Sequence, residues 1–218
     1  MIINRNFLSI LIALCLGSSV YAQFSAGIFS EVNYSSLTGD APPGAVYKSV
    51  PEFGTGGLFE YNITPYVKMS FQPAFQRAGT KIAYSKFSQR EPVDSIDINI
   101  DYFSVPLIMK VYGGTNIMYV LGGVSLGIKL NATYKEITSD KKINVDDSFN
   151  DINVAAIVGV GAQFRVGLFY VFVEGRYSQG LINIRNKNPG EPEELDLSFR
   201  TIGLQLFAGL TYSFGGSR

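Results

Sequence analysis

Eight amphipathic segments of this sequence are separated alternately by long polar connections and by tight turns. This alternation limits the folds available to the chain. The last segment closes on Phe214. An even number of strands, with long loops at one end and short turns at the other, is typical of an outer membrane β-barrel. The expected strands are 24–36, 53–63, 66–82, 96–112, 117–135, 152–165, 168–184 and 198–214.

Two-residue alternation is clearest in the segment 152–165. Its even positions from Val154 to Phe164 are apolar, whereas its odd positions include Asn153, Gln163 and Arg165. Successive side chains of a strand point to opposite faces, whereas a helical pattern would repeat every 3.6 residues. The alternation therefore predicts strands with one apolar face and one polar face, and an all-β, eight-stranded antiparallel transmembrane β-barrel.

The connections agree with this architecture. Tight turns that contain Pro or Gly are expected at 62–65, 113–116 and 165–168. Long polar loops are expected near 37–52, 83–95, 136–151 and 185–197. The long loops of outer membrane barrels face the outside of the cell, so we expect both chain ends in the periplasm.

The beginning of the chain has the pattern of a cleaved signal peptide. Arg5 supplies a positive charge, residues 7–16 form an apolar core, and small residues precede Gln23. This core is far shorter than the roughly 20 residues that a membrane-spanning helix needs. We therefore expect a signal peptide at 1–22 and a single outer membrane barrel domain at 23–218.

Charge and composition limit the possible functions. Charged residues make up 17% of the chain, below the roughly 25% of an average soluble domain, as expected if apolar surface faces lipid. The formal net charge is zero, which gives a nucleic-acid partner no electrostatic support. The expected partners are outer membrane lipids and the barrel-assembly machinery, with protein subunits of a secretion or envelope complex as a further hypothesis.

An enzyme is not expected, and neither is a cofactor. The sequence contains no histidine, which removes the commonest general base and a frequent metal ligand. The acidic stretch 146–151 has oxygen ligands for calcium but lacks the spacing of an EF-hand loop. We interpret it as a solvated loop and expect no metal site.

A secreted eight-stranded carrier of the lipocalin type is the alternative fold. Such a carrier would also alternate, but its apolar face would point inward and its charges outward. The polar face of the present segments is poor in charge and rich in Gly, Ser, Gln and Asn. This composition suits a packed lumen better than a solvated exterior and favours the membrane barrel.

Alternation places eight charged side chains on the polar, inward face. The interior of an eight-stranded barrel is just wide enough for side chains to fill it, and an isolated buried charge is very costly. We therefore expect a lumenal ion-pair network that closes the barrel. A small ion path is the alternative, and the excess of basic groups would favour anions. The residues are Glu31, Glu60, Lys68, Lys110, Lys129, Arg165, Glu174 and Arg176.

Pro106 is expected to mark a strand bulge. Proline removes one hydrogen bond from the strand ladder, so it usually lies at a bulge or a bend. The parity of the apolar positions also shifts there, from Ile98 and Ile100 to Val105 and Leu107.

Tyrosines gather near the expected tight turns and the chain end, where an aromatic girdle at the membrane interface belongs. Strict alternation turns Tyr66, Tyr112, Tyr119 and Tyr170 inward, so some of them could plug the lumen instead. The tyrosines are Tyr61, Tyr66, Tyr112, Tyr119, Tyr170 and Tyr212.

Two stretches resemble the PorT-like outer membrane β-barrel family of Bacteroidota. Residues 102–110, YFSVPLIMK, are similar to its fourth-strand signature, and residues 176–184, RYSQGLINI, to its seventh-strand signature. The closing strand, with Leu210, Tyr212 and Phe214, resembles the terminal strand that barrel-assembly machinery recognises. The resemblance implies a barrel, and its named member is linked to type IX protein secretion.

Two functional hypotheses follow. The first is a structural or interaction protein that presents external loops or docks a partner, as a component of a secretion or envelope complex. The second is a narrow channel or a small-ligand-binding barrel that works through its lumen.

Overall fold

The computed structural model describes residues 24–39, 45–84, 95–136, 142–144, 149–184 and 199–214. Within these residues no helix is long and apolar enough to span a bilayer. The expected signal peptide at 1–22 lies outside them. The strands are β1 (Phe24–Gly39), β2 (Ala45–Thr64), β3 (Val67–Phe71), β4 (Ala74–Tyr84), β5 (Ser95–Tyr112), β6 (Met118–Glu136), β7 (Lys142–Asn144), β8 (Ile152–Val166), β9 (Phe169–Gly180) and β10 (Phe199–Ser213).

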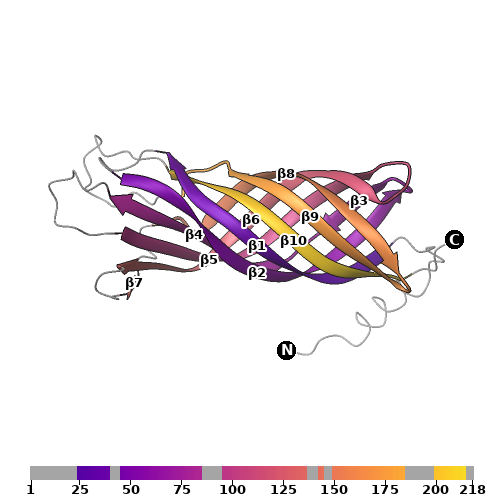
Figure 1. Ribbon diagram of the computed structural model, residues 1–218, viewed down its shortest axis with the longest axis horizontal. Coiled ribbons are helices and arrows are strands. Elements are labelled where there is room, and N and C mark those ends of the chain that lie inside the picture. Colours follow the sequence, from indigo (N-terminus) through magenta and orange to yellow (C-terminus); the bar gives the residue numbers. More distant parts are fainter. Residues whose placement is uncertain are drawn as a thin grey trace, which may run out of the picture.

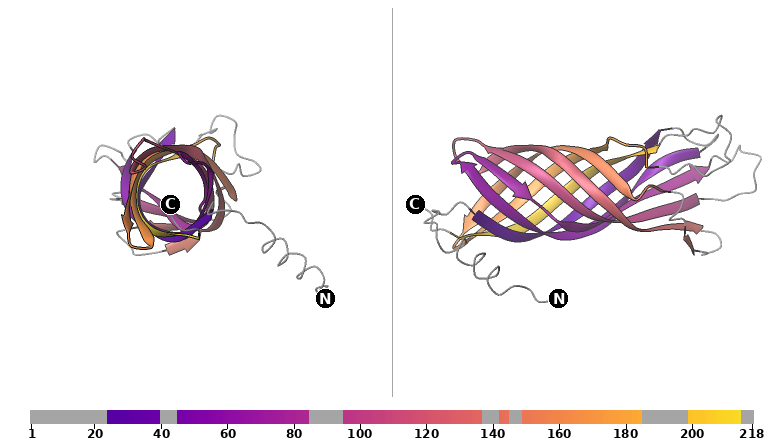
Figure 2. Two further views of the ribbon diagram at one scale, coloured as in Figure 1. Left: turned by 90° about the vertical axis from the view of Figure 1, so that its right-hand side faces the viewer. Right: turned by 180° about the vertical axis from the view of Figure 1, so that it is seen from behind.

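Eight strands close into an antiparallel ring (Figures 1 and 2). β3 and β4 act as one strand, because both pair with β2 and β5. The short β7 is an addition to β6. The ring closes where β1 pairs with β10, with Ile28 beside Leu210. The predicted fold class and number of barrel strands are therefore confirmed.

The two ends of the barrel differ. Ser25 and Ser213 lie side by side at the end that also carries the tight turns, which we call the terminal end. At the opposite, distal end, β6 continues to Glu136 although its pairing with β8 stops at Ile128. Figure 1 shows β2, β4 and β5 projecting there beyond β8, β9 and β10. β2 begins at Ala45, so the prediction of a loop over the whole of 37–52 is wrong.

The outward face of the barrel is apolar. On β8, Val158, Val160 and Phe164 are exposed, whereas Ile157 and Gln163 are buried in the lumen. At the terminal end an exposed aromatic belt is formed by Phe24, Tyr61, Tyr66, Phe169, Tyr212 and Phe214. A lipocalin-type carrier would place its apolar face inside, so that alternative is wrong. Leu210, Tyr212 and Phe214 all point outward, and their role as an assembly signal stays a prediction.

Pro106 does not mark a bulge, and that prediction is wrong. Buried inward positions keep one parity along β5 on both sides of Pro106. The backbone N–H of Gln72 donates to the carbonyl of Pro106 (3.0 Å), but proline has no N–H with which to return the bond. Pro73 likewise accepts from Gly57 (3.0 Å) and cannot donate. The two prolines therefore divide one long strand into β3 and β4.

Register shifts occur elsewhere in the barrel. On β6, Leu130 is an extra residue, because Asp101 lies beside Asn131 while Tyr102 lies beside Lys129. The pairing of β2 with β4 is interrupted between Ser49 and Gly54. Both irregularities lie toward the distal end, and irregularities of this kind bend a strand and increase its local twist.

Side chains of β1 close the interrupted seam between β2 and β4. Ser35 Oγ accepts a hydrogen bond from the N–H of Gly79 (2.7 Å) and donates to its carbonyl (2.9 Å). Asn33 Nδ2 donates to the carbonyl of Arg77 (3.3 Å). These two side chains thus occupy hydrogen-bonding positions on β4 that β2 leaves free.

Replacing Ser35 with alanine should destabilise the barrel, because it leaves both backbone groups of the buried Gly79 without their partner. The expected loss in the free energy of unfolding is about 1–3 kcal/mol, measured by urea unfolding in lipid vesicles. Amide exchange at Gly79 should also become faster. Ser30→Ala, on the exposed face of the same strand, is the matched control. Equal stabilities of the two variants would contradict this account of the seam.

Candidate functional site: a charged plug in the lumen

Six ionisable side chains from β1, β2, β3, β5 and β9 meet inside the barrel, and we call them the plug. Each occupies an inward position of its strand. Three are acidic and three are basic, so their formal charges cancel. The plug consists of Glu31, Glu60, Lys68, Lys110, Glu174 and Arg176.

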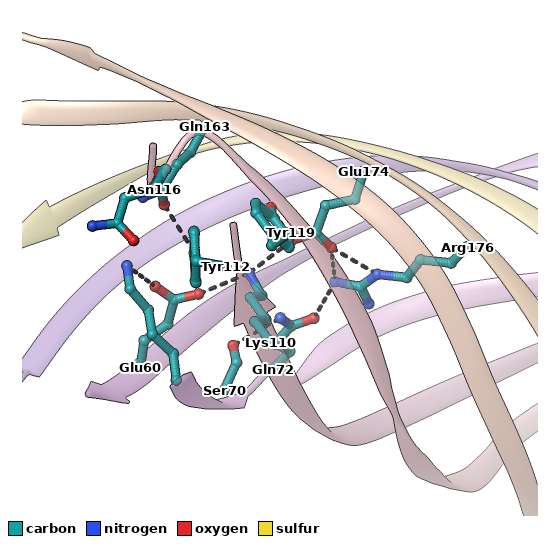
Figure 3. Close-up of polar contacts among 11 residues, drawn as sticks. Glu60, Ser70, Gln72, Lys110, Tyr112, Asn116, Tyr119, Gln163, Glu174 and Arg176 are labelled. Atoms are coloured by element: carbon teal, nitrogen blue, oxygen red, sulfur yellow. Dashed lines mark hydrogen bonds and ion pairs between the residues drawn. The ribbon is translucent and has the colours of Figure 1, made fainter. Parts of the chain in front are cut away.

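Lys110 is the centre of the plug. Its Nζ lies 2.7 Å from Glu60 Oε1 and 2.7 Å from Glu174 Oε1, and all three side chains are at most 2% exposed. Lys68 Nζ lies 3.6 Å from the other oxygen of Glu60. Figure 3 shows Glu60 and Glu174 on either side of Lys110, inside the barrel. Buried ions at these distances compensate one another, as the sequence argument required.

Arg176 connects the plug to the opposite wall. Its Nε donates to Glu174 Oε2 (2.8 Å), and its Nη2 donates to the same oxygen and to Gln72 Oε1 (2.7 Å). Gln72 in turn donates to Ser70 Oγ (2.8 Å). The guanidinium lies 3.7 Å from the centre of the Phe207 ring, a favourable cation–π arrangement. Arg176 therefore joins β9, β10 and the β3–β4 strand.

Two tyrosines close the lumen toward the terminal end. The hydroxyl of Tyr119 donates to Glu174 Oε1 (2.7 Å), and that of Tyr112 donates to Gln163 Oε1 (3.0 Å). Gln163 Nε2 then donates to the carbonyl of Asn116 (3.2 Å). The inward orientation expected for Tyr112 and Tyr119 is confirmed. Tyr66 is instead exposed, because it lies in the turn between β2 and β3.

Lys129 and Arg165 lie away from the plug. Lys129 is at the distal end, 3.0 Å from Asp151 Oδ1, and donates to the carbonyl of Phe149. Arg165 is exposed near the turn between β8 and β9 and donates to the carbonyl of Gly167. Its predicted place in the lumenal network is therefore wrong. Without these two residues the plug has no excess of basic groups, and the argument for an anion path loses its basis.

Several uncharged members of the network were not singled out in the sequence. Gln72 and Ser70 link Arg176 to β3, and Gln76 donates to Glu31 Oε2 (3.1 Å). Their signal was present, because these polar residues share the parity of Lys68 along one strand. Parity alone gives the face of a side chain but not its partner.

Apolar side chains surround the ion pairs. Phe29, Leu58, Ala74, Phe172 and Phe207 form one buried cluster, and Lys110 Nζ lies 5.1 Å from the centre of the Phe172 ring. Apolar surroundings of this kind lower the local dielectric constant and so strengthen the ion pairs. Among the described residues, no group of three His, Cys, Asp or Glu side chains could hold a metal ion. Residues 146–148 of the acidic stretch 146–151 lie outside the described residues.

An antiparallel ring of eight strands, apolar outside and lined inside by polar and charged side chains, defines a transmembrane β-barrel. Residues 18–186 match the model of the family described as outer membrane protein beta-barrel domain. The chain belongs to this family, which supports localisation in the outer membrane.

Solved structures of small outer membrane barrels are similar to this chain. Neisserial surface protein A is 14% identical, with a TM-score of 0.46, over 88% of this chain and 97% of that one. Ail of Yersinia pestis is 16% identical, with a TM-score of 0.42, over 87% and 99%. OprG of Pseudomonas aeruginosa is 14% identical, with a TM-score of 0.40, over 90% and 97%. No curated protein sequence matches the chain.

Proposed function

We propose that this protein is a non-conducting outer membrane barrel that acts as a structural or interaction protein within a secretion or envelope complex. The observation that carries the proposal is the plug. Lys110 is held between Glu60 and Glu174. These side chains occupy the part of the lumen that a pore or a transport path would need to keep open. With the lumen obstructed at the plug, the two ends and the outer surface of the barrel remain for contacts with partners, and we propose no enzymatic activity for it.

The distal end is the surface that we assign to docking. β2, β4, β5 and β6 project there beyond the other strands (Figure 2), and Lys48 on β2 is exposed. We place this end outside the cell and both chain ends in the periplasm, after cleavage of the segment 1–22, as is usual for such barrels. The resemblance of residues 102–110 and 176–184 to PorT-like barrels supports a role linked to secretion.

Gentle extraction of the tagged, full-length protein from native outer membranes tests this function. Sizing and mass spectrometry should find a large complex with defined subunits. A lone barrel that migrates as a folded, heat-modifiable species would overturn the proposal.

A matched pair of charge reversals tests where the partner docks. Lys48→Glu alters the distal end, and Arg165→Glu alters an exposed arginine at the terminal end. We expect Lys48→Glu to reduce recovery of the partner several-fold and Arg165→Glu to leave it unchanged. If Arg165→Glu reduces recovery of the partner and Lys48→Glu does not, the docking surface lies at the terminal end and the assignment to the distal end is wrong.

A further inference from the structure

A second polar region lies in the lumen on the distal side of the plug. It is a partly open cavity of about 50 Å³, which we call the chamber. Its wall residues include Asn33, Tyr102, Asn153 and Gln205, and Arg176 of the plug forms part of its lining. These strand positions are nearer the distal end than Glu60, Lys110 and Glu174, so the chamber and the centre of the plug are separate.

Five buried polar atoms of the chamber's lining residues have no hydrogen-bond partner among the described residues. Four of the side chains that carry them are at most 6% exposed, namely Asn33, Tyr102, Arg176 and Gln205. A buried polar atom without a partner costs about 1–3 kcal/mol, so native proteins rarely leave one unsatisfied. The atoms are Asn33 Oδ1, Tyr102 Oη, Asn153 Oδ1, Arg176 Nη1 and Gln205 Oε1.

The orphaned atoms indicate the chemistry of an occupant. The amide oxygens of Asn33, Asn153 and Gln205 accept hydrogen bonds, the Nη1 group of Arg176 donates, and the hydroxyl of Tyr102 can do either. Asn153 Nδ2 already donates to Thr201 Oγ1 (3.3 Å), which leaves its oxygen as the free group. The occupant must therefore donate several hydrogen bonds and accept at least one.

Charge and volume limit the occupant further. Arg176 is the only charged residue among the described residues that line the chamber, and its charge is already balanced within the plug, whose three acidic and three basic groups cancel. An ion would therefore enter without a counter-charge. A water molecule needs about 10–15 Å³ of such a cavity, so the volume suits about three to five waters or one small solute.

We propose that the chamber is a binding site for a small, uncharged molecule that both donates and accepts hydrogen bonds, anchored by Arg176 Nη1. Water and a neutral solute the size of acetamide share this chemistry. The inference is independent of the proposed function, because it concerns the lumen and not the docking surface.

Nuclear magnetic resonance of the full-length protein in micelles tests the site. Water should give cross-relaxation peaks to the side-chain groups of Asn33, Asn153 and Arg176. Titration with acetamide should either shift these peaks saturably, which identifies a solute site, or leave them unchanged, which identifies bound water. Absence of water peaks together with absence of any response to acetamide would overturn the proposal.

Gln205→Leu removes one orphaned oxygen from the chamber, whereas Gln179→Leu changes a glutamine on the outward face of β9 whose oxygen already accepts from Tyr177. If acetamide binds, Gln205→Leu should weaken binding about tenfold, the worth of one hydrogen bond. If water is the occupant, Gln205→Leu should weaken the water peaks at Asn153 and Arg176. Identical behaviour of both variants would contradict a specific site.

Discussion

Replacing Lys110 with methionine should lower the free energy of unfolding by about 3–5 kcal/mol, because it removes one partner from a buried charge network. Glu60 and Glu174 each lie 2.7 Å from Lys110 Nζ. In the variant two carboxylates face each other across an apolar space, and only Lys68 and Arg176 remain to balance them. Urea unfolding in lipid vesicles measures the loss, and the folded fraction on unheated gels should fall with it.

Two further variants distinguish the loss of the buried charge of Lys110 from the effect of replacing any lysine with methionine. Lys48→Met, at an exposed position of β2, should change the free energy of unfolding by less than about 0.5 kcal/mol. Adding Glu60→Gln to Lys110→Met should restore part of the stability, since it removes one uncompensated charge. Equal stabilities of Lys110→Met and Lys48→Met would show that the plug does not depend on its central ion.

Replacing Arg176 with methionine should have a comparable effect, about 3–5 kcal/mol. The substitution removes the hydrogen bonds from Arg176 to Glu174 and Gln72 and the contact with the Phe207 ring. Glu174 keeps Lys110 and Tyr119 as partners, but Gln72 loses the group that holds its oxygen. Methionine is unbranched and flexible, so it keeps part of the packing of the side-chain stem while the charge and the hydrogen bonds are lost.

Arg77→Met is the matched control for Arg176→Met. Arg77 also makes an ion pair, with its Nε 2.6 Å from Asp101 Oδ1, but its side chain is 48% exposed and points outward. Exposed pairs of this kind contribute about 0–1 kcal/mol. Comparing the two variants therefore tests whether burial makes the ion pair of Arg176 important for stability. If Arg77→Met lowers the free energy of unfolding as much as Arg176→Met does, this explanation is contradicted.

Much of the barrel could be predicted because strands repeat every two residues. The alternation from Val154 to Phe164 fixes the two faces of β8, and the same parity places Glu60, Lys110 and Glu174 in the lumen. Loop and turn composition predicted which strands are joined tightly. These are local properties of the chain, and an antiparallel barrel connects neighbours in sequence.

Other features depend on contacts that parity does not encode. The sequence could not distinguish a bulge at Pro106 from an interrupted ladder, because the outcome depends on Gln72, which lies between β3 and β4. The position of the extra residue, Leu130, is occupied by neither proline nor glycine, so the sequence gives no sign of the register shift there. Arg165 obeys the inward parity of β8, but it lies so close to the strand's end that its side chain is exposed and bonds to Gly167 in the following turn. The pairing of side chains inside the lumen could not be predicted either, because it depends on which strands face each other across the closed barrel.

The most direct test of the closed lumen is conductance of the purified, folded protein in a planar lipid bilayer, with an open porin as the positive control. If the plug closes the lumen, the recordings should show no discrete, sustained steps in current at neutral pH in moderate salt. Reproducible single-channel conductance from the folded protein would contradict a lumen sealed by Glu60, Lys110, Glu174 and Arg176.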